Sequence, residues 1–100
     1  MLYVMFAEDV ADSRERRAPV RAAHLSRLEQ LQAEGRLVLG GVMPAIDAED
    51  SGPAGQFGSL IVAEFNSLEE AEAWLAADPF VAAGVYARTM VRPFKKAALQ

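Results

Sequence analysis

The sequence predicts a single α+β domain over residues 1–100, with elements in the order strand, helix, strand, strand, helix, strand. Four segments are short apolar runs or alternate between apolar and polar residues, as β-strands do, and two others repeat apolar residues at helical spacing. The length is that of one domain. With right-handed crossovers, the simplest unknotted arrangement of this order is a ferredoxin-like, four-stranded antiparallel sheet with both helices on one face.

The first half of the chain supplies one strand and the longer helix. Residues 2–7 form an unbroken apolar run, which is typical of a central strand. Asp12 and Glu15 have the spacing of a capping box, so a short turn is expected before the main helix. The main helix is predicted over residues 18–34, since it has proline in its first turn and Gly35 as a left-handed cap.

A second strand and a long loop follow. The strand is predicted over residues 36–43, where Gly40 and Gly41 permit a bulge or the close approach of a ligand. Residues 45–57 are rich in glycine, proline and acidic side chains. A loop of this length is functional or disordered, and we expect a mobile lip over a pocket.

The second half of the chain repeats the pattern. The third strand is predicted over residues 58–65, and Ser67 begins the second helix as an N-cap. The fourth strand is predicted over residues 85–92, because apolar and polar residues alternate there. Strict alternation would place Tyr86 and Val91 on opposite faces of the sheet.

Both faces of the first and third predicted strands are apolar. One face carries Leu2, Val4, Phe6, Leu60 and Val62, and the other carries Tyr3, Met5, Ala7, Ile61, Ala63 and Phe65. Helices cover only one face of a ferredoxin-like sheet, so the other would remain uncovered. An uncovered apolar face of that size is unusual in a monomer. We therefore expect a homodimer in which two copies pack sheet to sheet.

Composition excludes several classes of function. The net charge of -4 offers no surface for nucleic acid or an anionic membrane. The chain has no cysteine and one histidine, so the usual zinc sites are excluded and no metal is expected. The acidic residues of the 45–57 loop fit no established cation loop. Residues 1–6 are too short for a signal or membrane segment, and we expect a cytoplasmic location.

The single histidine, His24, lies on an apolar helix face with Leu28 and Leu31, whereas Arg27 is assigned to the polar face. A buried imidazole needs a polar partner, and Asp78 is the best candidate because its segment returns to the same edge of the sheet. A carboxylate there would orient the imidazole as a general base. The alternatives are a satisfied core histidine and, for Asp78 before proline, an ordinary N-cap.

Other side chains are candidates for binding a substrate. Arg17 and Arg21 precede His24 on the same segment and would suit an anionic group, although a solvated basic face is the alternative. Tyr86, Phe80 and Trp74 would suit the wall of an aromatic pocket, although aromatic residues at these spacings usually belong to the core.

The chain resembles the YciI-like family, also called the YCII-related domain, over nearly its whole length. The likeness rests on the order and spacing of these segments: Leu2-Tyr3-Val4, Arg21-Ala22-Ala23-His24-Leu25, Gly35-Arg36-Leu37, Gly40-Gly41, Ala77-Asp78-Pro79-Phe80-Val81, Gly84-Val85-Tyr86 and Val91-Arg92-Pro93-Phe94.

The resemblance implies a dimeric α+β barrel with a paired histidine and aspartate, which correspond to His24 and Asp78. It implies acid-base elimination without a cofactor, such as loss of hydrogen chloride from chlorinated hydroxylated aromatics. Arg21, Gly41 and Tyr86 are then the expected substrate-binding residues, with Gly41 at a pocket edge where relatives often carry Gly-Pro. A non-catalytic binding module and a heme-handling barrel, with His24 on iron, are the alternative functions.

Overall fold

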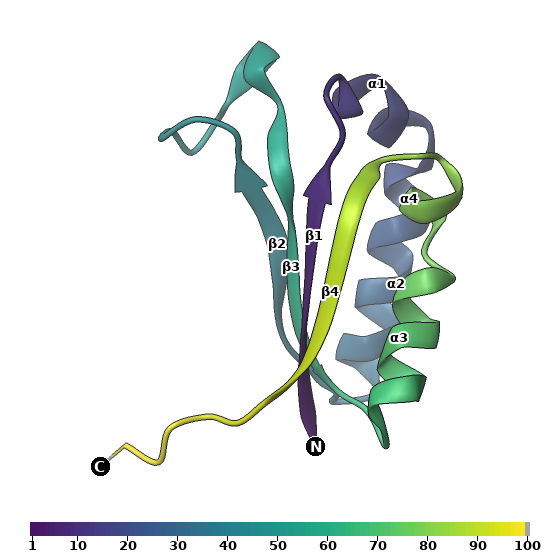
Figure 1. The fold of residues 1–100 in the computed structure, drawn as a ribbon, viewed down its shortest axis with the longest axis vertical. Coiled ribbons are helices and arrows are strands. Elements are labelled where there is room, and N and C mark those ends of the chain that lie inside the picture. The colour runs from purple at the N-terminus through teal and green to yellow at the C-terminus, as the bar shows by residue number, and fades with distance from the viewer. Residues whose placement is uncertain (100) are drawn as a thin grey trace.

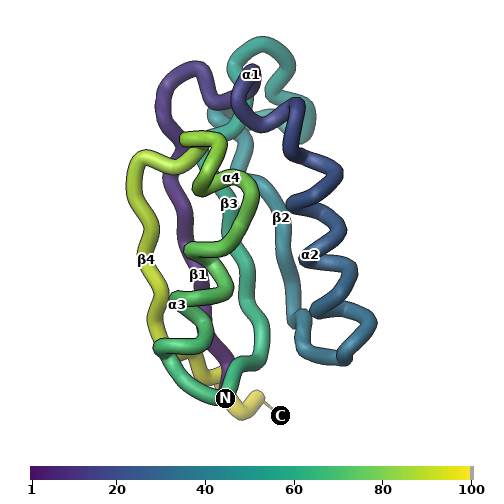
Figure 2. Tube along the Cα trace, turned by 90° about the vertical axis from the view of Figure 1, so that its right-hand side faces the viewer, coloured from purple at the N-terminus to yellow at the C-terminus, as the bar shows by residue number. Residues whose placement is uncertain are grey.

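The computed structural model describes residues 1–99 and shows one four-stranded antiparallel sheet with the helices on one of its faces (Figures 1 and 2). The strands lie in the order β2-β3-β1-β4, which confirms the ferredoxin-like prediction. The strands are β1 (Leu2–Asp9), β2 (Leu37–Pro44), β3 (Gln56–Glu64) and β4 (Tyr86–Phe94). The α-helices are α1 (Ser13–Arg17), α2 (Arg21–Ala33), α3 (Leu68–Ala76) and α4 (Pro79–Ala82), with 3-10 turns at Ala18–Val20 and Gly52–Ala54.

The central strand β1 pairs with β3 on one side and with β4 on the other. Its odd-numbered residues face the helices and are buried in a core with residues from α2, β3 and α3. Gly58 of β3 lies so close to β1 that an added Cβ atom would be 2.0 Å from the carbonyl oxygen of Ala7. Glycine is therefore a steric requirement of this strand pairing.

The expected capping box at Asp12 was wrong. Asp12 has a left-handed backbone with φ 62° and caps nothing with its side chain. The physical reason is that Asp9, at the end of β1, binds the first turn instead, by accepting a hydrogen bond from Ser13 Oγ at 2.6 Å. The predicted main helix is observed as the 3-10 turn Ala18–Val20 followed by α2, which ends at Ala33. Gly35 follows with φ 71°, which confirms the predicted left-handed cap.

The predicted alternation in β4 was also wrong at its start. The register with β1 shifts between Glu8 and Asp9, which leaves Ala87 as an extra residue on β4. Tyr86 and Val91 consequently both pack against the core on the helix side of the sheet. Sequence periodicity cannot detect such a bulge, because the residue types themselves still alternate.

The long connection between β2 and β3 folds back on itself. Ala45 N donates to Gly55 O at 3.1 Å, and Ser51 is buried although it lies in the middle of this loop. Strand β3 begins at Gln56, two residues earlier than predicted, so the loop ends earlier as well.

No helix among residues 1–99 is long and apolar enough to cross a membrane. The sheet face opposite the helices is not covered by any part of residues 1–99 (Figure 1). The strand register places these apolar residues on it: Leu2, Val4, Phe6, Leu39, Leu60, Val62, Met90 and Phe94. We call this set the open sheet face.

Candidate functional site

The structure brings His24 of α2 and Asp78 together, 54 residues apart in the chain, and buries both side chains. His24 Nδ1 lies 2.9 Å from each carboxylate oxygen of Asp78. Asp78 also caps α4, because its Oδ1 accepts from Phe80 N at 2.9 Å. The N-cap and the histidine partner, which are alternatives in the sequence, are therefore roles of the same carboxylate.

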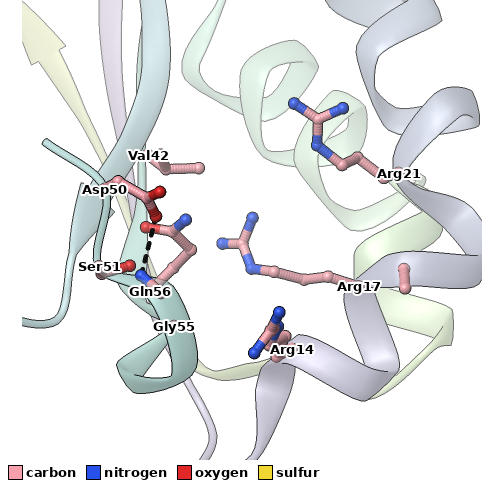
Figure 3. A pocket seen from close by; sticks show the side chains of 10 residues that line it. Arg14, Arg17, Arg21, Val42, Asp50, Ser51, Gly55 and Gln56 are labelled. Atoms are coloured by element: carbon pink, nitrogen blue, oxygen red, sulfur yellow. Dashed lines mark hydrogen bonds between the residues drawn. The ribbon is translucent and has the colours of Figure 1, made fainter.

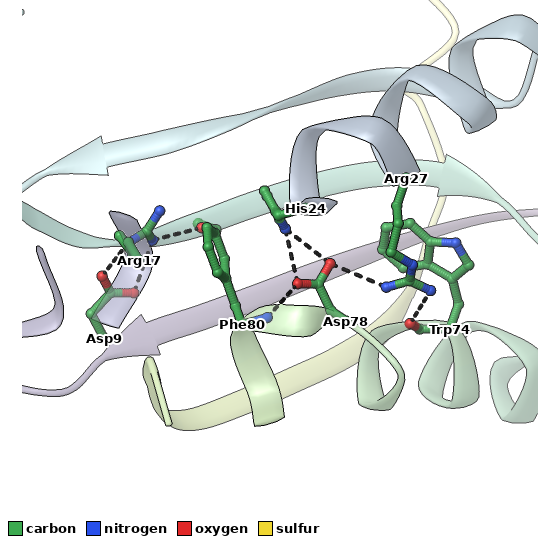
Figure 4. Close-up of polar contacts among 8 residues, drawn as sticks. Asp9, Arg17, His24, Arg27, Trp74, Asp78 and Phe80 are labelled. Carbon is green, nitrogen blue, oxygen red and sulfur yellow. Dashed lines mark hydrogen bonds and ion pairs between the residues drawn. The ribbon is translucent and has the colours of Figure 1, made fainter. Parts of the chain in front are cut away.

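A stack of three side chains fixes the plane of the imidazole. The His24 ring lies 4.0 Å from the Phe80 ring, nearly parallel to it. The guanidinium of Arg17 lies 4.7 Å from the Phe80 ring centroid, and Figure 4 shows the phenyl ring between Arg17 and His24. His24 Nε2 makes no hydrogen bond with any residue in the described part of the chain, so this nitrogen is available to a ligand.

Arg27 is a third member of the site, and the assignment to a polar face misplaces it. Arg27 Nη1 donates to Asp78 Oδ2 at 3.1 Å, and its Nη2 donates to Trp74 O at 2.7 Å. The guanidinium stacks on the indole ring of Trp74 at 4.1 Å. The available sequence signal was its spacing of three residues from His24, which places both side chains on neighbouring parts of one helix surface.

Asp78 is held in its ionised form. Burial alone would raise the pKa of this carboxyl group, but the hydrogen bonds from His24 and from Phe80 N, with the charges of His24 and Arg27, outweigh burial. The pKa of Asp78 is therefore lowered below its ordinary value. An ionised carboxylate at this position orients the imidazole through its Nδ1 atom.

Arg17, expected to hold a substrate anion, is committed to an internal ion pair. It donates to both oxygens of Asp9, at 2.7 and 3.0 Å, and to Ser59 Oγ at 2.9 Å. Both members of the pair are buried. The two parallel hydrogen bonds to Asp9 neutralise the guanidinium of Arg17. Arg17 therefore packs on Phe80 and is not free to bind a substrate anion.

Tyr86 lies beside the same cluster. Its ring meets Phe80 edge-on with centroids 5.9 Å apart. Its hydroxyl is buried and has no hydrogen-bond partner among residues 1–99. Burial raises the pKa of Tyr86 to about 12, although the neighbouring Ser59 hydroxyl and the charge of Arg17 act in the other direction.

A pocket of about 320 Å³ opens next to this site, between the start of α2 and the β2–β3 connection (Figure 3). Arg21 lines this pocket, but His24 and Asp78 do not. Gly41 is not brought to the site: it pairs with Leu60 and belongs to the opposite side of the sheet, with open space around its Cα atom. No group of three metal-binding side chains occurs among residues 1–99.

Comparison with known proteins identifies the family. Residues 1–95 match the YCII-related domain. The chain is 59% identical to Protein YciI of Escherichia coli O6:H1 over 96 residues, which cover 96% of this chain and 98% of that protein. It is 52% identical to an uncharacterized protein of Haemophilus influenzae with the same coverage.

Solved structures agree with the fold. With a TM-score of 0.83 and 32% identity, the chain is similar to the 5-chloro-2-hydroxyhydroquinone dehydrochlorinase TftG of Burkholderia phenoliruptrix AC1100, solved in complex with 2,5-dihydroxybenzoquinone. The match covers 97% of this chain and 96% of that one. A Pseudomonas aeruginosa protein, PA3566, shares the fold at a TM-score of 0.52 and 9% identity. The protein belongs to the YCII-related domain family.

Proposed function

We propose that this protein is a cofactor-independent acid-base enzyme that acts on a small hydroxylated ring compound, with His24 as the general base. The observation that carries the proposal is the buried pair itself: Nδ1 is held by an ionised carboxylate while Nε2 has no partner among the described residues. This arrangement fixes one imidazole tautomer and leaves the basic nitrogen for a substrate proton.

The pair suits elimination of hydrogen chloride, the chemistry named for the relative TftG. In the keto tautomer of a chlorinated hydroxylated ring, chlorine sits on a saturated carbon. Nε2 of His24 takes the hydroxyl proton, the O–H electron pair forms a carbonyl bond, the ring double bond shifts, and chloride leaves with the C–Cl pair. Hydrogen chloride is the only loss, so the step balances without an oxidant or reductant.

Asp78 and Arg27 act on His24 rather than on the substrate in this mechanism. When the imidazole takes the proton, its new positive charge faces the Asp78 carboxylate 2.9 Å away. Arg27 keeps that carboxylate ionised and fixed in place. Phe80, stacked on the imidazole, limits rotation of the ring. Positioned acid-base groups of this kind contribute about 10² to 10⁴ in rate.

The working unit in this proposal is a homodimer. The open sheet face would expose Leu39 and Met90, which are 49% and 53% exposed in one chain. A second copy packed on this face would remove that surface from water.

The test uses 5-chloro-2-hydroxyhydroquinone under anaerobic conditions, with chloride release as the measurement. The wild-type protein is expected to release chloride, and His24→Gln is expected to lower kcat by about 10² or more. Asp78→Asn is expected to lower kcat as well, because the imidazole loses its negative partner. Glu29→Gln, an exposed change on the same helix, is the matched control and should keep the wild-type rate.

Two results would contradict the proposal. One is a wild-type protein that releases no chloride above the uncatalysed rate. The other is a folded His24→Gln variant, judged by circular dichroism, that retains the wild-type rate.

A further inference from the structure

Three arginine side chains converge on the pocket beside the histidine site. Arg14, Arg17 and Arg21 extend from the α1–α2 segment toward the β2–β3 connection, where Asp50 and Gln56 form the opposite wall (Figure 3). Like charges that line one pocket repel one another unless counter-charges are present. Each guanidinium in the pocket therefore needs a negative partner, either from the protein or from a bound ligand.

Only one of the three forms an ion pair with a residue in the described part of the chain. Arg17 is neutralised by its paired hydrogen bonds to Asp9. The guanidinium groups of Arg14 and Arg21, both exposed residues that line the pocket, make no hydrogen bond or ion pair with residues 1–99. Two guanidinium groups thus face one concave surface with their donors unused by the described protein.

The pocket carries a net positive charge that matches a single anionic group. Its three arginines are opposed by the carboxylates of Asp9 and Asp50, which leaves one positive charge in excess. Asp50 is further engaged as the acceptor for Gly52 N at 2.9 Å. Gln56 adds a polar wall, and its side-chain carbonyl oxygen is buried without a partner among the described residues. A polar ligand suits these groups better than an apolar one.

The volume and position of the pocket limit the ligand further. About 320 Å³ is at the small end of ligand pockets, enough for one substituted six-membered ring. Arg21 lies three residues before His24 on the same helix, so the two side chains share one surface of α2. Arg17 links the pocket to the imidazole through Phe80, which both side chains contact.

We propose that Arg14 and Arg21 form an anion subsite that binds the carboxylate of a small organic monoanion. Bidentate guanidinium–carboxylate hydrogen bonds are the interaction that such a pair is built to make. The inference rests on the proposed function in one respect: the bound ring is taken to be a substrate of His24, which lies one helical turn from Arg21. Within the class of small hydroxylated rings, it predicts tighter binding of those that also carry a carboxylate.

Calorimetric titration with two probes of one shape tests the subsite. The anion is 4-hydroxybenzoate, and the neutral analogue is 4-hydroxybenzamide. The wild-type protein is expected to bind the benzoate at least about tenfold more tightly than the benzamide, with an affinity that falls as salt is added. Arg14→Gln and Arg21→Gln are each expected to weaken benzoate binding about tenfold and to leave benzamide binding unchanged.

Two further variants distinguish specific binding by Arg14 and Arg21 from nonspecific attraction of the anion to any nearby positive charge. Arg16→Gln removes the same charge from the same helix, but Arg16 is not among the lining residues, so benzoate binding should stay at the wild-type level. Asp50→Asn removes the opposing carboxylate yet keeps an oxygen for Gly52 N, and it should tighten benzoate binding. A purely structural role for Asp50 would not produce tighter binding.

The inference is overturned if the wild-type protein does not bind 4-hydroxybenzoate at millimolar concentration, or binds both probes equally. It is also overturned if Arg16→Gln weakens binding as much as Arg21→Gln. These results are independent of turnover, because His24→Gln should still bind the benzoate. A wild-type protein that binds the benzoate but releases no chloride from 5-chloro-2-hydroxyhydroquinone contradicts the acid-base proposal alone.

Discussion

Asp78 shows how one side chain serves both the fold and the candidate site. Its Oδ1 caps α4, and the same carboxylate binds His24 and Arg27. Because the cap holds the carboxylate against the backbone, the imidazole finds its partner already fixed. The fold itself therefore orients His24 through Asp78.

The lowered pKa of Asp78 predicts how stability depends on pH. Since the folded-state pKa lies below the unfolded value of about 3.9, the stabilisation is fully present above that pH and is lost as pH falls through the folded pKa. Asp78→Asn should be less stable than the wild-type protein at neutral pH, and this difference should shrink below about pH 4. Urea unfolding at several pH values measures it. A difference that is constant from neutral to acidic pH would contradict an ionised, paired Asp78.

At the scale of elements, two irregularities of the sheet place the site. The bulge that leaves Ala87 unpaired turns Tyr86 toward Phe80 on the helix side. The close approach of β3 to β1 at Gly58 keeps Ser59 beside the Asp9–Arg17 pair, to which it is hydrogen-bonded. Strand register, rather than any single contact, thus supports the stack on which His24 rests.

Gly58→Ala should therefore destabilise the protein strongly. The new Cβ atom would lie 2.0 Å from Ala7 O, and the neighbouring atoms are backbone that cannot move without breaking the β1–β3 ladder. We expect a loss of about 3 kcal/mol or more in the free energy of unfolding, above the usual range for overpacking. Gly40→Ala is the control, because its added Cβ would meet only Leu28 and Leu37 side chains at an ordinary 3.6 Å. Equal losses for the two variants, measured by chemical denaturation, would contradict the steric argument.

At the scale of the whole molecule, the helices cover one side of the sheet, and nothing in residues 1–99 covers the other (Figure 1). The chain has 52% hydrophobic residues, and part of that share lies on the open sheet face. The proposed homodimer would bury this face in the interface between its two copies.

Light scattering measures the mass in solution. The wild-type protein is expected at twice the 10.8 kDa of one chain, and Met90→Glu on the open sheet face should shift it toward the monomer. Val81→Glu, which changes an exposed apolar residue of α4 on the helix layer, should leave the dimer intact. A wild-type protein that is monomeric at micromolar concentration would contradict the proposed assembly.

The sequence by itself determined the order of elements, the antiparallel sheet and the pairing of His24 with Asp78 as a hypothesis. These follow from local signals: apolar periodicity, the left-handed cap at Gly35, and a lone histidine on an apolar face that requires a partner. The elements were readable because each depends on residues close together in the chain. Asp78, 54 residues from His24, was chosen from the expected topology and from the family resemblance.

The tertiary structure decided which residues make up the candidate site and how they are arranged. Arg27 binds Asp78 across 51 residues of sequence, and Arg17 forms an ion pair with Asp9 of another element. Arg14 lines the pocket together with residues of the β2–β3 connection. Each of these positions depends on how separate elements pack. An arginine on a helix has the same local pattern whether it meets water, a carboxylate or an empty pocket. Only the packing of α1 and α2 against the sheet fixes which of these each guanidinium meets, because that packing sets the distances on which charge interactions depend.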